Sequence, residues 1–590
     1  MKKKLLDLIG GHFMDKPIDL VKNNHTLRGT ADNWDLKVRV ATRKSHQNKD
    51  YHLLASNLIA NRICFDHLPN DKPIFDDIRK LPKQSFYMNF NEWKMYKKTT
   101  KILIGRIIVE FFPKFKFLKK LLPNHIEHKY SQQMNKKSTI INMPIIDANE
   151  ASYADCVKVL ETYEKWIAEI YNKAGKLDKV PKAGDEILIN NQAETGQRYA
   201  HTLFTQNDPM KDMKIVFGGD MLTRVRFAGA KDLRKGAHTP SDRFEHCSPF
   251  KPVMWHCKAS LLQYSYALLH SPESVQQEGT LKFFREALNR RNVTPKKVLD
   301  SYEGCEELFI SIGKAYIVTA AMNFFKMNSL DENPKEHAFP VNFIHSSKEV
   351  KEKYLDDVLD KFVDKFVLQI GYSQGDYVQN YAYLFIFLTV LLLQMKDTAK
   401  EGDDDRNFIN QKLLLTTFRS LGNYSKYSIE MFVSLAQQQC LLTPRLSEEF
   451  KWGFFVNWRG GPGHNMEEDL AQEISNCKGK EIVKSMGPNK TIKSISRVCK
   501  AVNGIKKISE NFNENCSINN SSTQHSKPDE MNDEKEIISI LTKLDPFNYV
   551  NGRHHASFPD IKSTPSRYIN IVENDKWIEE HKELLYVPPQ

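Results

Sequence analysis

The sequence lacks the cysteine patterns that would most directly constrain its fold. It has nine cysteines, an odd number, and no two of them are spaced as Cys-x-x-Cys. A small secreted domain held together by disulfides is therefore disfavoured, and so are the common zinc modules built on Cys-x-x-Cys pairs. Scattered thiols of this kind are typical of a protein that stays inside the cell.

Long hydrophobic runs are also missing. The longest apolar run extends from Tyr381 to Met395, which is shorter than the roughly 20 residues that a membrane-spanning helix needs. We expect this run to form a fully buried helix. The N-terminal segment MKKKLLDLIG begins like a signal peptide, but Asp7 interrupts its short apolar stretch. The sequence therefore predicts an intracellular protein without a membrane segment.

Size and charge favour a multi-unit protein with a polyanionic partner. A chain of 590 residues exceeds one ordinary core, and its 41% hydrophobic content excludes a disordered protein. The net charge of +12 suits a polyanionic partner, although charge alone indicates non-specific binding rather than function. Basic residues with interleaved aromatics, a pattern that can track phosphates and stack bases, gather at 114–120 and 224–234. A solvated lysine face over a core would explain each of these two stretches equally well.

Three acidic clusters lie far apart in the sequence. They share a carboxylate beside a predicted strand or at a predicted helix start, and they occupy residues 32–35, 218–220 and 465–473. Two strand-borne aspartates followed by a helix-borne acid are what a two-metal phosphoryl-transfer site of the ribonuclease-H type requires. Carboxylates are hard ligands for Mg²⁺, and two ions about 4 Å apart clamp the attacking and leaving oxygens.

Each cluster also has a structural interpretation. Asp32 fits an acid that bonds local backbone amides in an Asx-turn. Asp220 follows two glycines and fits a helix N-cap. In the third cluster, Asp469 and Glu473 lie four apart on one helix face, and first-turn acids there would complement the helix dipole. Which of these two acids would complete a metal site stays open.

Two further groups of polar residues carry weaker hypotheses. Histidines and cysteines gather between 238 and 257, but their spacing matches no familiar zinc module, so zinc is not expected. Residues 401–406 (EGDDDR) lack the distal glutamate of a calcium loop, and we interpret them as a capped turn between helices.

The pattern along the chain predicts an α/β protein: a ribonuclease-H-like mixed-sheet core interrupted by a large all-helical insertion, with a helical C-terminal arm. We expect the following segments, in chain order: the first part of the core at 1–255, with a basic helical excursion at 80–135; the helical insertion at 256–450; the return of the core with the acidic helix at 451–509; a flexible linker at 510–535; and the arm at 536–590.

The sequence resembles a known family, the domain of unknown function 6589, which is found in transposon-like reading frames. The matching pieces, in order, are DNWD (32–35) with His52, LPNHIEHKYSQQMNKKST (122–139), Asn149-Glu150, FGGDMLTRVRFAGA (217–230), WHCK (255–258), KEGDDDR (400–406), WRGGPGHNMEEDLAQEISN (458–476) and GPNKT (487–491). Their order extends over most of residues 30–505.

The resemblance implies descent from a cut-and-paste DDE-type transposase with a helical insertion in its core. Mapped onto this chain, it implies Asp32, Asp220 and Glu473 as catalytic acids, which together with Asp469 would hold Mg²⁺ or Mn²⁺. The short segment before Asp32 and the Asp403–Asp405 run depart from the family pattern and weigh against full transposase activity. A catalytically inactive scaffold of the same fold, binding nucleic acid or protein, is therefore the alternative.

The expected partner is DNA, and the protein is expected in the nucleus. Whether it forms a homo-oligomer stays open. The candidate DNA-contacting residues are positively charged or titratable and lie near the second and third acidic clusters: Arg224, Arg226, Lys231, Arg234, Lys235, His256 and Arg459.

Overall fold

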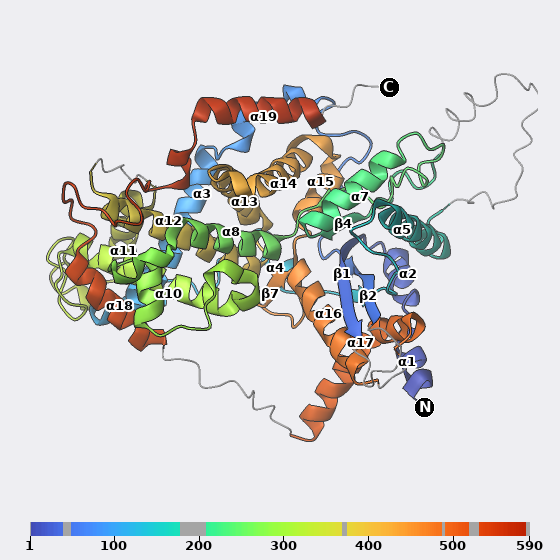
Figure 1. Cartoon of the computed structure of the whole chain (residues 1–590), viewed down its shortest axis with the longest axis horizontal. Coiled ribbons are helices and arrows are strands. Elements are labelled where there is room, and N and C mark those ends of the chain that lie inside the picture. Colours follow the sequence, from blue (N-terminus) through green and yellow to red (C-terminus); the bar gives the residue numbers. More distant parts are fainter. Residues whose placement is uncertain are drawn as a thin grey trace, which may run out of the picture. The chain divides into compact units, whose positions relative to one another are not determined.

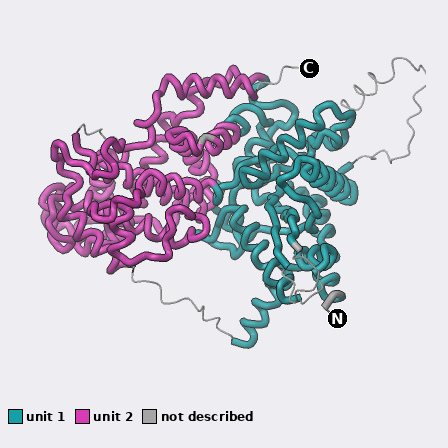
Figure 2. Tube along the Cα trace, viewed as in Figure 1, with its two compact units in different colours: residues 1–76, 130–256, 436–522 teal, residues 77–129, 257–435, 523–590 magenta. Residues whose placement is uncertain are grey.

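The chain forms two compact units, each assembled from three separate stretches of sequence (Figures 1 and 2). The structure is a computed structural model and describes residues 2–38, 49–177, 208–368, 375–486, 490–517 and 530–585. Unit 1 contains residues 1–76, 130–256 and 436–522, and unit 2 contains residues 77–129, 257–435 and 523–590.

Unit 1 contains every β-strand that the described residues form. Its elements are α1 (Lys2–Gly10), α2 (Asp15–Lys22), β1 (Leu27–Val38), β2 (Lys49–Ala60), α4 (Ser131–Met134), β3 (Ile140–Asn142), α5 (Tyr153–Lys173), β4 (Val216–Gly219), α7 (Met221–Leu233), β5 (Phe250–Lys251), η9 (Gln437–Leu441), α15 (Pro444–Lys451), β6 (Phe455–Asn457), β7 (Asn465–Glu467), α16 (Glu468–Lys484) and α17 (Ile492–Asn515). Helix α8 (Met254–Leu269) begins in this unit.

The main sheet has the strand order β3-β2-β1-β4-β5. Strand β2 is antiparallel to both β1 and β3, whereas β4 runs parallel to β1 and β5 parallel to β4. Strands β6 and β7 form a separate antiparallel pair. The sheet therefore joins an antiparallel half to a parallel half at β1.

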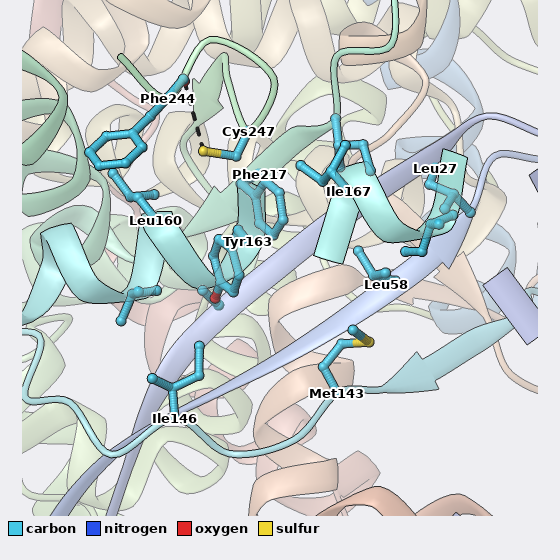
Figure 3. Close-up of a cluster of buried hydrophobic side chains, with 14 of the residues drawn as sticks. Leu27, Leu58, Met143, Ile146, Leu160, Tyr163, Ile167, Phe217, Phe244 and Cys247 are labelled. Carbon is cyan, nitrogen blue, oxygen red and sulfur yellow. Dashed lines mark hydrogen bonds between the residues drawn. The ribbon is translucent and has the colours of Figure 1, made fainter. Parts of the chain in front are cut away.

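Alternation along β1 and β2 divides the core of unit 1 between the two faces of the sheet. On one face, Leu27, Ala31 and Leu58 pack with residues of α5 and α7. Figure 3 shows Tyr163 of α5 beside Phe217 of β4, and their rings stack with centroids 4.5 Å apart. The other face packs on α16 and α17 through residues that include Trp34, Leu36, Leu53, Ala55, Val483, Ile495 and Val498. The sheet thus lies between two helical layers.

A glycine in β1 makes room for the aromatic stack. A Cβ on Gly29 would lie 2.2 Å from Cε1 of Phe217, which is too close for any side chain. Since Gly29 is directly opposite Phe217 in the β1–β4 register, this position admits only glycine while the Phe217 ring keeps its place.

Unit 2 forms helices and no β-strand among its described residues. Its elements are η1 (Ile78–Lys80), η2 (Lys83–Phe86), α3 (Phe90–Phe111), η3 (Pro113–Leu121), the remainder of α8, η4 (Pro272–Gln276), α9 (Leu281–Ala287), η5 (Pro295–Ser301), α10 (Tyr302–Phe325), η6 (Phe343–His345), α11 (Lys348–Val363), η7 (Asp364–Leu368), α12 (Tyr377–Glu401), α13 (Asp404–Arg419), η8 (Gly422–Tyr424), α14 (Ser425–Ala436), α18 (Glu530–Leu544), η10 (Pro565–Tyr568) and α19 (Ile571–Leu585).

Two helical segments of unit 2, Pro295–Phe325 and Tyr377–Glu401, are long and apolar enough to cross a membrane by length and composition. In each, 83% of the most apolar window is buried inside the protein, as is usual for the core helices of a folded unit. The expected buried helix at 381–395 is confirmed as the centre of α12.

The predicted mixed α/β class is confirmed, and local boundaries differ in places. Residues 26–65, whose pattern favours strands, contain β1 and β2. The segment at 510–535, expected to be a flexible linker, includes the end of α17 at Asn515 and the start of α18 at Glu530. Residues 518–529 of that prediction lie outside the described residues.

Candidate functional site

Helix α16 lies along β1 and is joined to it by three polar contacts at regular spacing. We call this series the β1–α16 ladder, and its pairs are Arg28–Glu468 (Nε to Oε2, 3.1 Å), Thr30–Gln472 (Oγ1 to Oε1, 3.1 Å) and Asp32–Asn476 (Oδ2 from Nδ2, 2.7 Å). Residues two apart on β1 contact residues four apart on α16. Two residues advance about 6.6 Å along the strand and four residues advance about 6.0 Å along the helix, so the two elements stay in register.

The first ladder pair is part of a buried ion cluster. The Glu468 carboxylate also lies 2.8 Å from Nζ of Lys251, and the side chains of Arg28, Glu468 and Lys251 are at most 2% exposed. A Cβ on Gly218 would lie 2.4 Å from Oε1 of Glu468. The glycine before the second acidic cluster therefore leaves space for this carboxylate.

Two of the predicted acids come from adjacent parallel strands. Ala31 of β1 is directly opposite Gly219 of β4, so Asp32 and Asp220 are the next residues on strands that lie about 4.8 Å apart. Asp220 also caps α7, since its Oδ1 accepts a 2.7 Å hydrogen bond from the Thr223 amide. The helix-cap interpretation of Asp220 is thus confirmed.

Four carboxylates influence one another around Asp32, and we call Asp32, Glu150, Asp220 and Glu473 the acid group. Burial raises the pKa of Asp32 well above its ordinary value, and the charge of Glu473 raises it further. The cation of His256 opposes this effect, and the remaining two carboxylates add to it. The Asp32 carboxyl therefore holds its proton more tightly than an exposed aspartate does.

The two candidate acids of α16 have different contacts. Asp469 accepts hydrogen bonds from the backbone amides of Trp255 (3.2 Å) and His256 (3.0 Å), at the start of α8. It also accepts one from His256 Nδ1 at 3.0 Å. The Glu473 side chain is half-buried and has no hydrogen-bond or ion-pair partner among the residues that the structure describes.

His256 is a positive charge beside the acid group. Burial would lower the pKa of His256, but its bond to Asp469 and the charges of that and other nearby carboxylates raise it to about 9. The imidazole is therefore protonated at neutral pH, and it offsets part of the negative charge.

Glu150 was not among the predicted site residues, although it belongs to one of the pieces that carry the family resemblance. It is 6% exposed; its Oε1 accepts a 2.9 Å hydrogen bond from Asn33, and its Oε2 accepts one from the Thr223 hydroxyl. Burial raises the pKa of Glu150, and the charge of Asp220 raises it as well. Its inclusion in the motif Asn149-Glu150 was the only signal in the sequence.

Among the described residues, no group of three or more His, Cys, Asp or Glu side chains is arranged so that it could coordinate a metal ion. One carboxyl oxygen of Asp32 accepts from Asn476, one of Asp220 accepts from the α7 amide, and Glu473 has no such bond to a described residue. The donor chemistry of these carboxylates suits a hard divalent cation.

The predicted DNA-contacting residues divide by exposure. Arg459 and Lys235 are exposed, Lys235 in a local ion pair with Asp232. The others are at least partly covered: Arg226 lies over the Tyr153 ring at 4.5 Å, Lys231 donates to Ser248 (2.8 Å), Arg234 pairs with Glu161, Arg224 is half-buried on α7, and His256 contacts Asp469.

The histidine and cysteine stretch at 238–257 contains a buried structural contact. His246 lies between two carboxylates, with Nδ1 2.7 Å from Glu164 and Nε2 2.9 Å from Asp208. Burial would lower the pKa of His246, but these two carboxylates raise it to about 9. The imidazole is therefore a charged link between α5 and the segment before β4.

Residues 371–375 read Gly-Tyr-Ser-Gln-Gly and match the Gly-x-Ser-x-Gly pattern of a nucleophile elbow. Such an elbow follows a strand, whereas here the preceding element is the helical η7. Residues 369–374 lie outside the described residues, so the match carries no site.

Unit 1 is thus a mixed α/β unit with a group of interacting carboxylates at adjacent strand ends and on a covering helix. The model of a family of unknown function, DUF6589, matches residues 75–525. This match covers most of the chain, so the protein belongs to that family. Asp220, Asp469 and Glu473 lie inside the matched range, and Asp32 precedes it. Comparisons with curated proteins and with solved structures found no match.

Proposed function

We propose that this chain is a transposase-derived, DNA-binding protein that acts on phosphodiesters, with Asp32, Asp220 and Glu473 as ligands of two Mg²⁺ or Mn²⁺ ions. The observation that carries the proposal is the acid group. Carboxylates from three distant parts of the sequence lie within electrostatic range of buried Asp32, and their charges raise its pKa. Such an arrangement is common where a bound cation completes a site.

The sheet supports a ribonuclease-H-like core. Three antiparallel strands are followed by β4 and β5 parallel to β1, in the order β3-β2-β1-β4-β5; sheets of ribonuclease-H-like proteins have this arrangement. On this proposal the helical stretch 256–450 is an insertion in the core, and residues 536–590 form a C-terminal arm.

The contacts of each acid fit the proposed roles. Asn476 fixes the orientation of Asp32, and the α7 amide fixes that of Asp220. Glu473 can turn toward a ligand without breaking a bond to any described residue. Bound ions would supply a clamp on the attacking and leaving oxygens of the phosphodiester. The His256 cation would attract a phosphate oxygen, and Asp469 would hold that imidazole in place.

DNA is the partner on this proposal, and the protein works in the nucleus. The exposed Arg459 and Lys235 would contact phosphates directly. The partly covered basic residues of α7 would contribute to the local potential. Whether the protein acts as a homo-oligomer stays a separate question.

A metal-dependent cleavage assay tests the proposal. Wild-type protein should nick or cut duplex DNA in Mg²⁺ or Mn²⁺ but not in EDTA, and Asp220→Asn should lower the rate by at least about a hundredfold, since a metal contributes several kcal/mol to the transition state. The matched control is Glu481→Gln. Glu481 lies on α16 with Glu473, but its side chain is 68% exposed and lies 3.7 Å from Lys478, so cleavage should stay within about twofold of wild type.

A catalytically inactive scaffold is the second candidate. The favouring observation is that three acids already have structural contacts: Asp32 with Asn476, Asp220 with α7, and Asp469 with α8. This candidate predicts DNA binding that weakens as salt rises, with no cleavage in either metal. Cleavage that Asp220→Asn abolishes would exclude it.

A further inference from the structure

A cavity of about 300 Å³ opens beside the acid group in unit 1. It lies where β1 and β2 approach the starts of α5 and α7. Its walls are formed by three polar side chains, two carboxylates and three small or apolar groups: Asn33 and Asp35 of β1, His52 and Leu53 of β2, Asn149, Glu150 and Ala151 before α5, and Leu222 of α7. This volume is at the small end of the range for ligand sites, so it suits a ligand of nucleotide size.

The walls combine apolar surface with two carboxamides of defined orientation. Asn33 donates to Glu150 (2.9 Å), which leaves its Oδ1 without a partner among the described residues. Asn149 accepts from the Ala151 amide (3.0 Å), which leaves its Nδ2 without one. One fixed acceptor and one fixed donor therefore line a cavity that also has the apolar wall of Leu222 and the imidazole of His52.

These features match the edge and face of a nucleobase. Every base carries hydrogen-bond donors and acceptors on its edge, and proteins that extract a base hold it by such bonds between apolar or aromatic side chains. The cavity also shares Glu150 with the acid group, and the charge of Glu150 acts on Asp32. A base held here would bring its own backbone phosphate toward the carboxylates.

We propose that this cavity binds one unpaired nucleotide of a DNA substrate, next to the phosphodiester on which the acid group acts. The proposal rests on the proposed function for the identity of the substrate, and on the cavity itself for the binding. It assigns Asn33 and Asn149 to the base edge, and Leu222 and His52 to its faces.

Binding of deoxyadenosine monophosphate to the full chain in EDTA tests the cavity without any cleavage. Ala151→Trp should weaken binding at least tenfold, because Ala151 is exposed on the cavity wall and an indole there would fill the space. The control is Val225→Trp on α7, since Val225 is 41% exposed and does not line the cavity; binding should stay within about twofold.

The two proposals fail differently. Binding that is absent in the wild type, or equal in Ala151→Trp and wild type, would overturn the nucleotide cavity whatever the cleavage assay shows. Binding that Ala151→Trp blocks, in a protein that cuts no DNA in either metal, would retain the cavity and remove the nuclease. Asp220→Asn should leave nucleotide binding in EDTA unchanged while it abolishes cleavage.

Discussion

Removing the Glu468 carboxylate is the most direct test of how α16 is held on the sheet. The Glu468 side chain is fully buried between the cations of Arg28 and Lys251, whose side chains are 2% and 0% exposed. In Glu468→Ala, both buried cations would lose this carboxylate. Arg28 would keep its bonds to Asn61 and the Phe455 carbonyl, and Lys251 its bond to the Gly453 carbonyl.

The expected loss is large relative to the stability of a folded unit. Removing one partner of a buried ion pair costs about 3–5 kcal/mol, and here one carboxylate serves two cations, so we expect ~4–5 kcal/mol. Folded units have roughly 5–15 kcal/mol in total. Glu468→Ala should therefore fold but open readily, and Glu468→Gln, which keeps the size and an acceptor oxygen, should lose less.

Native-state hydrogen exchange of the β1 amides measures this loss within unit 1, independently of unit 2. The control is Glu481→Ala on the same helix, where the side chain is 68% exposed and lies 3.7 Å from Lys478. Its effect should stay within about 0.5 kcal/mol. A fall of less than about 1 kcal/mol in the opening free energy of β1 for Glu468→Ala would refute the reasoning that the buried ion cluster anchors the helix.

Three further outcomes follow from close contacts and buried charges. Gly218→Ala should lower unit 1 stability by about 1–3 kcal/mol, because its Cβ would lie 2.4 Å from Glu468, whereas Gly236→Ala, with open space around it, should change the melting temperature little. The pKa of His246 is raised to about 9 in the fold, above the 6.5 of an exposed histidine. Its contribution to stability is therefore complete below about pH 6.5 and is lost as pH rises through 9; His246→Gln should flatten the pH dependence of the melting temperature in that window, and an unchanged slope would contradict this. Since the pKa of Asp32 is raised by burial and by nearby carboxylates, apo stability should fall as pH rises above the unfolded value of about 4, and Mg²⁺ should raise the melting temperature more at pH 8 than at pH 5; an equal shift at both would count against metal binding at the acid group.

Local patterns in the sequence predicted the helices and strands of unit 1 better than the tertiary contacts between them. The two glycines and Asp220 beside a predicted strand marked the end of β4 and the start of α7. The burial of Arg28, Thr30 and Asp32 in β1 was harder to predict, because these side chains are polar. Their partners in α16 lie 440 to 444 positions away in the sequence. Periodicity carries no information about such distant pairs.

For the candidate site, too, local patterns identified some residues, and tertiary contacts determine the others. The three acidic clusters were visible as carboxylates near predicted strand ends and a helix start. Glu150 and Asn476 were not predicted to act in the site, because a single glutamate before a helix and an asparagine within one are ordinary residues for those positions. Their importance comes from tertiary contacts with Thr223 and Asp32, which depend on the register of whole elements.

That register also decides which acid of α16 lies near Asp32. Asp32 pairs with Asn476 in the β1–α16 ladder, and Glu473 is three helical residues from that pair, or roughly 4.5 Å along the axis, whereas Asp469 is seven residues away, or roughly 10 Å. Sliding the helix by one turn would bring Asp469 to the place of Glu473. It would also set His464 opposite Arg28 in place of Glu468, and so separate the Glu468 carboxylate from the two buried cations with which it pairs. The ion cluster at one end of the ladder therefore fixes the acid at the other.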